Sequence, residues 1–163
     1  MDNKVVQTLA RTMVQLGYTA VRFNFRGVAG SEGSWDQGHG EVQDALAVIA
    51  AHQAGGQSLV LGGFSFGGYV ASQAAASLPA GSRPQRLVLV GPAVVNFEMA
   101  AVPEDTLVVH GEQDDVVPLT AVFDWARPQA LPVTVLPGAG HFFHGQLTVL
   151  KQIVLRAWCP QIP

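Results

Sequence analysis

The fold is decided by the stretch Leu59-Val60-Leu61-Gly62-Gly63-Phe64-Ser65-Phe66-Gly67-Gly68-Tyr69. Its apolar start, Leu59–Leu61, predicts a buried strand, and the Ala-rich run Tyr69–Ala76 predicts a helix. Between them lies a Gly-x-Ser-x-Gly turn, which in this strand–turn–helix context is typical of a nucleophile elbow, although an ordinary Gly-rich turn has the same composition. Glycines allow the strand and the helix to approach closely, and the first helical amides point toward Ser65. Ser65 is therefore a candidate nucleophile, and the backbone N–H of Phe66 is a candidate donor to an oxyanion.

The composition is that of one domain with a large interior. The chain has 163 residues, of which 48% are hydrophobic and only 13% charged, against roughly 25% charged in an average domain. We therefore expect a single domain over residues 1–163. The net charge of −3 gives no reason to expect nucleic acid or an anionic membrane as a partner. Cys159 is the single cysteine, no Cys/His cluster has the spacing of a metal site, and without a signal peptide or membrane segment a cytoplasmic protein is expected.

Predicted helices and strands alternate along the chain. Helices are expected from Asp2, as the cap, to Gly17 and over Glu41–Gln53, Tyr69–Ala76, Val116–Ala126 and Gln146–Trp158, and strands over Thr19–Arg26, Leu59–Leu61, Arg86–Gly91, Thr106–Gly111 and Val133–Leu136. This alternation predicts an α/β fold with right-handed crossovers and a mostly parallel sheet. Arg22 and Arg26 flank Phe23–Phe25, where we expect them to hold the fold or face solvent.

Polar residues follow three of the predicted strands, at the sheet edge where ligands bind in open α/β folds. Ser65 follows Leu59–Leu61, the pair Asp114 and Asp115 follows the strand ending at Gly111, and His141 follows the strand Val133–Leu136. The order serine, aspartate, histidine is the one found in α/β hydrolases. A serine needs a base to become nucleophilic, a neutral imidazole suits that task near pH 7, and a carboxylate orients the imidazole. The sequence thus predicts a triad of nucleophile, base and orienting acid.

Each role in the triad has a rival. His144 could replace His141 as the base, but the small residues Gly-Ala-Gly before His141 favour the latter. The residues alone barely separate Asp114 from Asp115 as the orienting acid. His110 lies inside a predicted strand and is expected to be a core histidine whose hydrogen bonds are satisfied.

Four motifs together resemble the small bacterial α/β hydrolases that lack a lid domain, including dienelactone-hydrolase-like and esterase-type members. These motifs are Arg22–Gly27 followed by Gly30–Gly33, Gly63–Gly68, His110–Pro118 and Gly140–Phe143. The resemblance covers almost the whole chain. It implies a three-layer α/β/α fold, Asp114 as the acid, and hydrolysis of carboxylic esters or related acyl bonds without a metal or cofactor.

The sequence departs from that family at its start. Family members have two or three strands before the helix that begins here at Asp2. The last of these strands lies between those matching Val21–Phe25 and Leu59–Leu61, and the loop after it supplies a second oxyanion donor. This sequence contains neither, so we expect an N-terminally truncated sheet and a fragment of a longer protein.

The expected function is hydrolysis of a small ester or acyl substrate through an acyl-enzyme, with Ser65, His141 and Asp114 as the catalytic residues. The alternative is a non-catalytic relative, or an inactive fragment, that binds a ligand or partner in the same cleft. A nucleotide-binding loop is excluded because Gly68 and Tyr69 stand where lysine and Ser/Thr are required. The sequence identifies neither the ester nor the oligomeric state.

Overall fold

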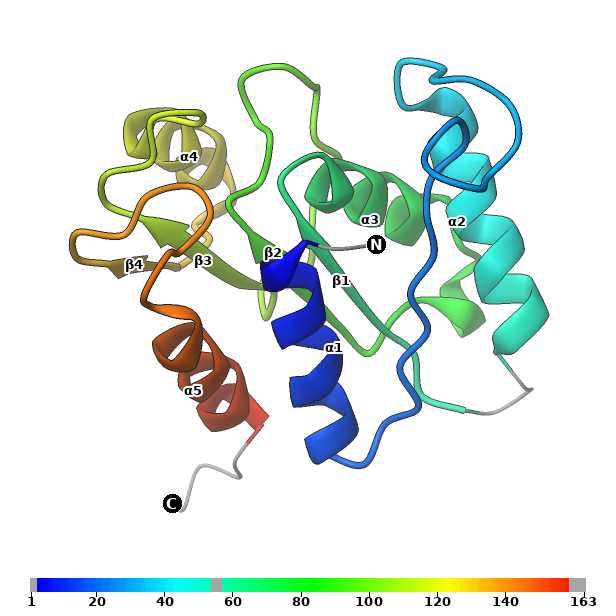
Figure 1. Ribbon diagram of the computed structural model, residues 1–163, viewed down its shortest axis with the longest axis horizontal. Helices are drawn as coiled ribbons and strands as arrows, with labels where there is room; N and C mark the ends of the chain where they lie inside the picture. The colour runs from blue at the N-terminus through cyan, green and yellow to red at the C-terminus, as the bar shows by residue number, and fades with distance from the viewer. Residues whose placement is uncertain (1–2, 54–56, 159–163) are drawn as a thin grey trace.

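The computed structural model describes residues 3–53 and 57–158 as a three-layer α/β/α fold (Figure 1). Its elements, in chain order, are α1 (Lys4–Gln15), α2 (His39–His52), β1 (Val60–Phe64), α3 (Phe66–Ser77), η1 (Ala80–Ser82), β2 (Arg86–Val90), β3 (Leu107–Gly111), α4 (Leu119–Ala126), η2 (Arg127–Gln129), β4 (Val133–Leu136) and α5 (Leu147–Trp158). The predicted fold class is confirmed.

The four described strands form one parallel sheet in the order β1-β2-β3-β4. Alternate residues of β3 serve opposite faces, because side chains alternate along a strand. Val109 belongs to the core beneath α1 and α5, whereas Val108 packs under α4. Helix α3 covers β1 and β2, and α2 packs against α3. With its faces covered in this way, the sheet can consist of apolar strands such as Leu87–Val90, which is almost fully buried.

Most predicted elements are confirmed, with shifts at their ends. Helix α3 begins at Phe66 rather than Tyr69, and α4 begins at Leu119 rather than Val116. The predicted cap, Asp2, lies outside the described residues. The N-cap of α1 is Asn3, whose side-chain oxygen accepts hydrogen bonds from the backbone of Val5 and Val6, as a cap residue does at a helix start.

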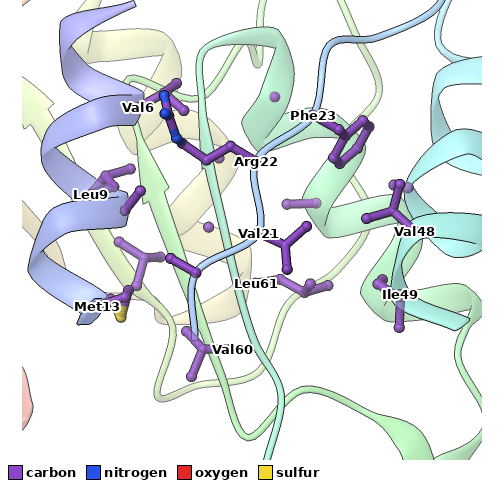
Figure 2. A pocket seen from close by; sticks show the side chains of 18 of the residues that line it. Val6, Leu9, Met13, Val21, Arg22, Phe23, Val48, Ile49, Val60 and Leu61 are labelled. Carbon is purple, nitrogen blue, oxygen red and sulfur yellow. The ribbon is translucent and has the colours of Figure 1, made fainter. Parts of the chain in front are cut away.

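The predicted strand Thr19–Arg26 is wrong. This segment is extended, but it is not assigned to a strand in the sheet. A cavity of about 850 Å³ separates it from β1, lined by apolar side chains of α1, α2, β1 and the extended segment. Figure 2 shows Val21 beside this cavity and Arg22 reaching toward Val6 of α1. Alternating residue types gave the segment the local pattern of a strand, but a strand also needs a neighbour for its backbone hydrogen bonds.

The cavity lies where the sequence predicts a gap in the sheet. It separates Val21 and Phe23 from Val60 and Leu61, the two segments between which the resemblance to lidless hydrolases predicts a further strand. The cavity also borders Ser65 at the end of β1. The described sheet therefore has β1 as an edge strand directly beside the candidate nucleophile.

The extended segment is tied to α2 by a bidentate ion pair. The Arg26 guanidinium donates from Nε to Asp44 Oδ2 at 2.9 Å and from Nη2 to Asp44 Oδ1 at 2.7 Å. The hydrogen bond from Arg26 lowers the pKa of the Asp44 carboxyl, while burial acts in the opposite direction. The expectation that Arg26 holds the fold is consistent with this contact.

Replacing Asp44 with Asn is expected to lower the melting temperature at pH 7, because Arg26 loses its charged partner. The pKa of Asp44 is lower in the folded chain, so its stabilisation is fully present above the unfolded value of about 3.9 and is lost as pH falls through the folded value. The difference in melting temperature between wild type and Asp44→Asn should therefore narrow below about pH 4, as followed by circular dichroism.

Asp124→Asn is the matched control. Asp124 also pairs with an arginine, Arg127, but both side chains are about 70% exposed, and exposed pairs contribute little to stability. Its melting temperature should stay close to that of wild type at every pH. Equal losses in Asp44→Asn and Asp124→Asn would contradict a structural role for the partly buried pair of Arg26 and Asp44.

Candidate active site

Ser65 sits on a strained turn between β1 and α3. Its backbone has φ 53° and ψ −121°, a conformation that a residue with a side chain rarely adopts. The turn is fixed by its neighbours, because Ser65 N–H donates to Val90 O on β2 and Gly68 N–H donates to Ser65 O. A Cβ added to Gly63 would lie 2.1 Å from Gly67 O. The chain therefore needs glycine at position 63 to bring β1 against the start of α3.

The other two candidate residues come from loops that follow β3 and β4. The turn after β3 carries Asp114, and the turn after β4 carries His141. These turns are packed tightly, since a Cβ on Gly111 would lie 2.4 Å from Ala139 O. Because parallel strands end at the same edge of the sheet, all three side chains arrive at one place.

The structure brings Ser65, His141 and Asp114 into one chain of hydrogen bonds. Ser65 Oγ lies 3.1 Å from His141 Nε2, and His141 Nδ1 lies 2.7 Å from Asp114 Oδ2. Since a carboxylate only accepts, Nδ1 carries the proton and Nε2 is left to accept from the serine hydroxyl. Asp114 and His141 are 7% and 4% exposed, whereas Ser65 is half-buried. The geometry is that of a base held ready beside an accessible hydroxyl.

The rivals of the triad residues lie elsewhere. Asp115 is exposed, while Asp114 Oδ1 accepts hydrogen bonds from the backbone of Val116 at 2.9 Å and of Val117 at 2.8 Å. His144 is also exposed, and its ring lies against Phe142. The arrangement therefore distinguishes Asp114 and His141 from their neighbours in the sequence.

Phe66 is the first residue of α3, so its N–H is one of the amides that have no partner within a helix. Phe66 directly follows Ser65, and the N–H of the residue after the nucleophile is the one that donates to the oxyanion in α/β hydrolases. The Phe66 ring belongs to an aromatic group with Tyr69 and Phe97, at centroid distances of 5.9 Å and 5.0 Å. Phe142 is 47% exposed and lies edge-on to the His141 ring. The residue that follows Ser65 and the candidate base thus both contact aromatic rings.

Two contributors to the site escaped the sequence analysis. Gly91 directly follows β2 and lies beside the imidazole, since an added Cβ would lie 3.4 Å from His141 Cε1. The prediction for His110 as a core histidine is right about its burial, but Nδ1 has no hydrogen-bond partner among the described residues. The only feature of the sequence that points to a contact between His110 and the candidate acid is their spacing, since Asp114 follows four residues later.

No group of three or more His, Cys, Asp and Glu residues is placed to hold a metal ion in residues 3–53 and 57–158. In the same ranges, none of the helices combines the length and the apolar character needed to span a bilayer.

A parallel sheet between helical layers, with a serine on the sharp turn after a strand, defines an α/β hydrolase. The family model described as serine aminopeptidase, S33, matches residues 3–104, more than half of the chain, and the chain belongs to this family. An uncharacterised protein of Rickettsia prowazekii is 31% identical over 88% of the chain, which spans 66% of that relative's own length.

Solved structures of lidless or similar hydrolases share the fold. An α/β serine hydrolase homologue from Coxiella burnetii is 38% identical, with a TM-score of 0.81, and the match covers 98% of this chain and 78% of that one. A lidless serine hydrolase from Xanthomonas campestris is also 38% identical, with a TM-score of 0.83 and coverage of 100% and 77%. The resemblance inferred from the four sequence motifs is confirmed at the level of the superfamily.

Because the backbone of Gly67 lies so close to Gly63, a side chain at position 63 should destabilise the fold. Gly63→Ala forces backbone atoms of β1 and α3 apart, and we expect a loss of about 1–3 kcal/mol or more, the cost of overpacking. Thermal unfolding should therefore begin several degrees earlier than in wild type.

Gly67→Ala is the matched control from the same motif. A Cβ at Gly67 meets nothing within 4 Å, and alanine is favoured over glycine in a helix by about 1 kcal/mol. Its melting temperature should equal or exceed that of wild type. Equal destabilisation by the two substitutions would show that the close contact at Gly63 does not hold the turn.

Proposed function

We propose that this protein is a serine hydrolase that cleaves a small carboxylic ester or related acyl bond through an acyl-enzyme. The observation that carries the proposal is the hydrogen-bonded chain from Ser65 Oγ to His141 Nε2 at 3.1 Å and from His141 Nδ1 to Asp114 Oδ2 at 2.7 Å. Membership of the α/β hydrolases supports hydrolysis as the class of reaction.

In the first half of the proposed reaction, Ser65 Oγ attacks the ester carbonyl carbon while its proton passes to His141 Nε2. The carbonyl oxygen becomes an oxyanion that accepts from the Phe66 N–H, and Asp114 stabilises the imidazolium. When the carbon–oxygen bond to the alcohol breaks, His141 returns the proton to that alcohol, which leaves. The acyl group then remains on Ser65.

In the second half, water takes the place of the alcohol. His141 accepts a proton from water as the water oxygen attacks the acyl carbon, and the proton returns to Ser65 Oγ when the acyl-enzyme bond breaks. The products are a carboxylic acid and the free enzyme. Every proton in the cycle moves through His141 Nε2, so no metal or cofactor is required by the proposed steps.

A small molecule is the proposed partner of this site. Ser65 is half-buried, the ring of the next residue, Phe66, contacts Phe97, and Phe142 contacts the His141 ring. Aromatic neighbours of this kind suit an apolar acyl or alcohol group. The net charge of −3 does not favour nucleic acid or an anionic membrane. The cytoplasm is the proposed place of action.

A second candidate is a non-catalytic relative that binds a ligand in the cleft. The cavity of about 850 Å³ beside β1 favours this candidate, because it borders Ser65 and leaves open space beside the candidate nucleophile. The two candidates differ in one simple respect. A binding protein would not turn over any ester in a manner that depends on Ser65.

The test is hydrolysis of p-nitrophenyl acetate and butyrate by the whole chain, with matched substitutions of two adjacent aspartates. Asp114→Asn should lower kcat by about 10⁴-fold, because an amide favours the wrong imidazole tautomer. Asp115→Asn should leave kcat within about twofold, since surface changes away from the site have small effects. Ser65→Ala should reduce turnover to the uncatalysed background.

Two results would contradict this proposal. Turnover close to that of wild type in Ser65→Ala would mean that Ser65 is not the nucleophile. Equal losses in Asp114→Asn and Asp115→Asn would mean that the contact between Asp114 and His141 does not identify Asp114 as the orienting acid.

A further inference from the structure

His110 is a buried histidine at the end of β3 that the proposed reaction does not use. Its Nε2 lies 2.8 Å from the carbonyl oxygen of Val117, and its Nδ1 has no partner among the described residues. A carbonyl can only accept a hydrogen bond, so the proton of the imidazole lies on Nε2. Burial lowers the pKa of His110, which favours the neutral ring.

The same Nε2 also faces the candidate catalytic acid. It lies 3.6 Å from Asp114 Oδ2, the oxygen that accepts the hydrogen bond from His141. Val117 completes the contact, because its N–H donates to Asp114 Oδ1 while its C=O accepts from His110. The loop from Asp114 to Val117 is thus held from inside the sheet by a single side chain of β3.

We propose that His110 is a positioning residue that fixes the Asp114 carboxylate in line with His141. The proposal rests on the proposed function. An unpaired buried nitrogen is destabilising, and an apolar side chain at this place would avoid that cost. What an apolar side chain lacks is the N–H that binds Val117 O and points its positive end toward Oδ2.

The neutral state of His110 matters for this role. His141 and Asp114 are the titratable groups that act on it electrostatically. A charged ring beside Asp114 Oδ2 would compete with the His141 imidazolium for the same carboxylate. A neutral N–H holds the loop without this competition, so the negative charge of Asp114 remains available to His141.

The first test compares two substitutions of His110. The amide of Gln reaches about as far as Nε2 and can donate to Val117 O, whereas Phe fills the space without a donor. His110→Phe should lower kcat for p-nitrophenyl butyrate by about tenfold or more, as loss of an outer hydrogen-bond partner does at other sites, with KM nearly unchanged. His110→Gln should stay within about threefold of wild type. Wild-type kcat in His110→Phe would overturn the proposal.

A double-mutant cycle separates positioning from general packing. In an Asp114→Asn background, adding His110→Phe should cause no further loss of kcat, because His110 acts through the carboxylate that is already gone. An equal loss in both backgrounds would overturn the proposal. Val122→Ala, in the buried cluster that contains Val117, is the packing control and should lower stability without lowering kcat.

A third measurement decides the matter without any turnover. Proton NMR should show the Nδ1 proton shared by His141 and Asp114 as a separate downfield signal in wild type and in His110→Gln. This signal should be lost or displaced in His110→Phe. A signal in His110→Phe that is the same as in wild type would overturn the proposal, even if no ester is hydrolysed. If the signal is lost or displaced in His110→Phe as expected but wild type hydrolyses no ester, only the proposed function is contradicted. His110→Leu replaces His110→Phe if the latter does not fold.

Discussion

The site depends on one constraint, the backbone of Ser65 at φ 53° and ψ −121° between β1 and α3. This conformation is unfavourable for serine, so the surrounding contacts must enforce it. Ser65 N–H is bonded to β2, and the carbonyl of Gly67 occupies the space that a side chain at position 63 would need. As a result, the turn holds the hydroxyl beyond the end of the sheet, beside the first amides of a helix. A relaxed turn would offer neither.

The parallel strands bring the other two residues of the site to the strained turn. Ser65, Asp114 and His141 each follow the end of a different strand, and adjacent ends lie at one edge of the sheet. The depth of each group then differs. Asp114 and His141 are buried, where their mutual hydrogen bond is strong, whereas Ser65 is only half-buried and remains open to a substrate.

The sequence predicted what local patterns and strand order determine. Apolar runs identified β1 to β4, and the order of strand ends predicted which side chains would meet. Pairing across the sheet is not local, so the alternation in Thr19–Arg26 was wrongly interpreted as a strand, although no described strand lies beside it. The role of His110 escaped for a related reason. It depends on a loop that returns the Val117 carbonyl to the strand, and no periodicity predicts such a return.

In the proposed reaction Ser65 and His141 act as one unit, with the imidazole activating the hydroxyl. Labelling with a fluorophosphonate, followed by mass spectrometry of the intact protein and its peptides, tests this most directly. We predict one adduct per chain, located on Ser65, that forms at least about a hundredfold more slowly in His141→Ala, the size typical of general-base catalysis. Unchanged labelling in His141→Ala, or an adduct on another residue, would contradict the claim.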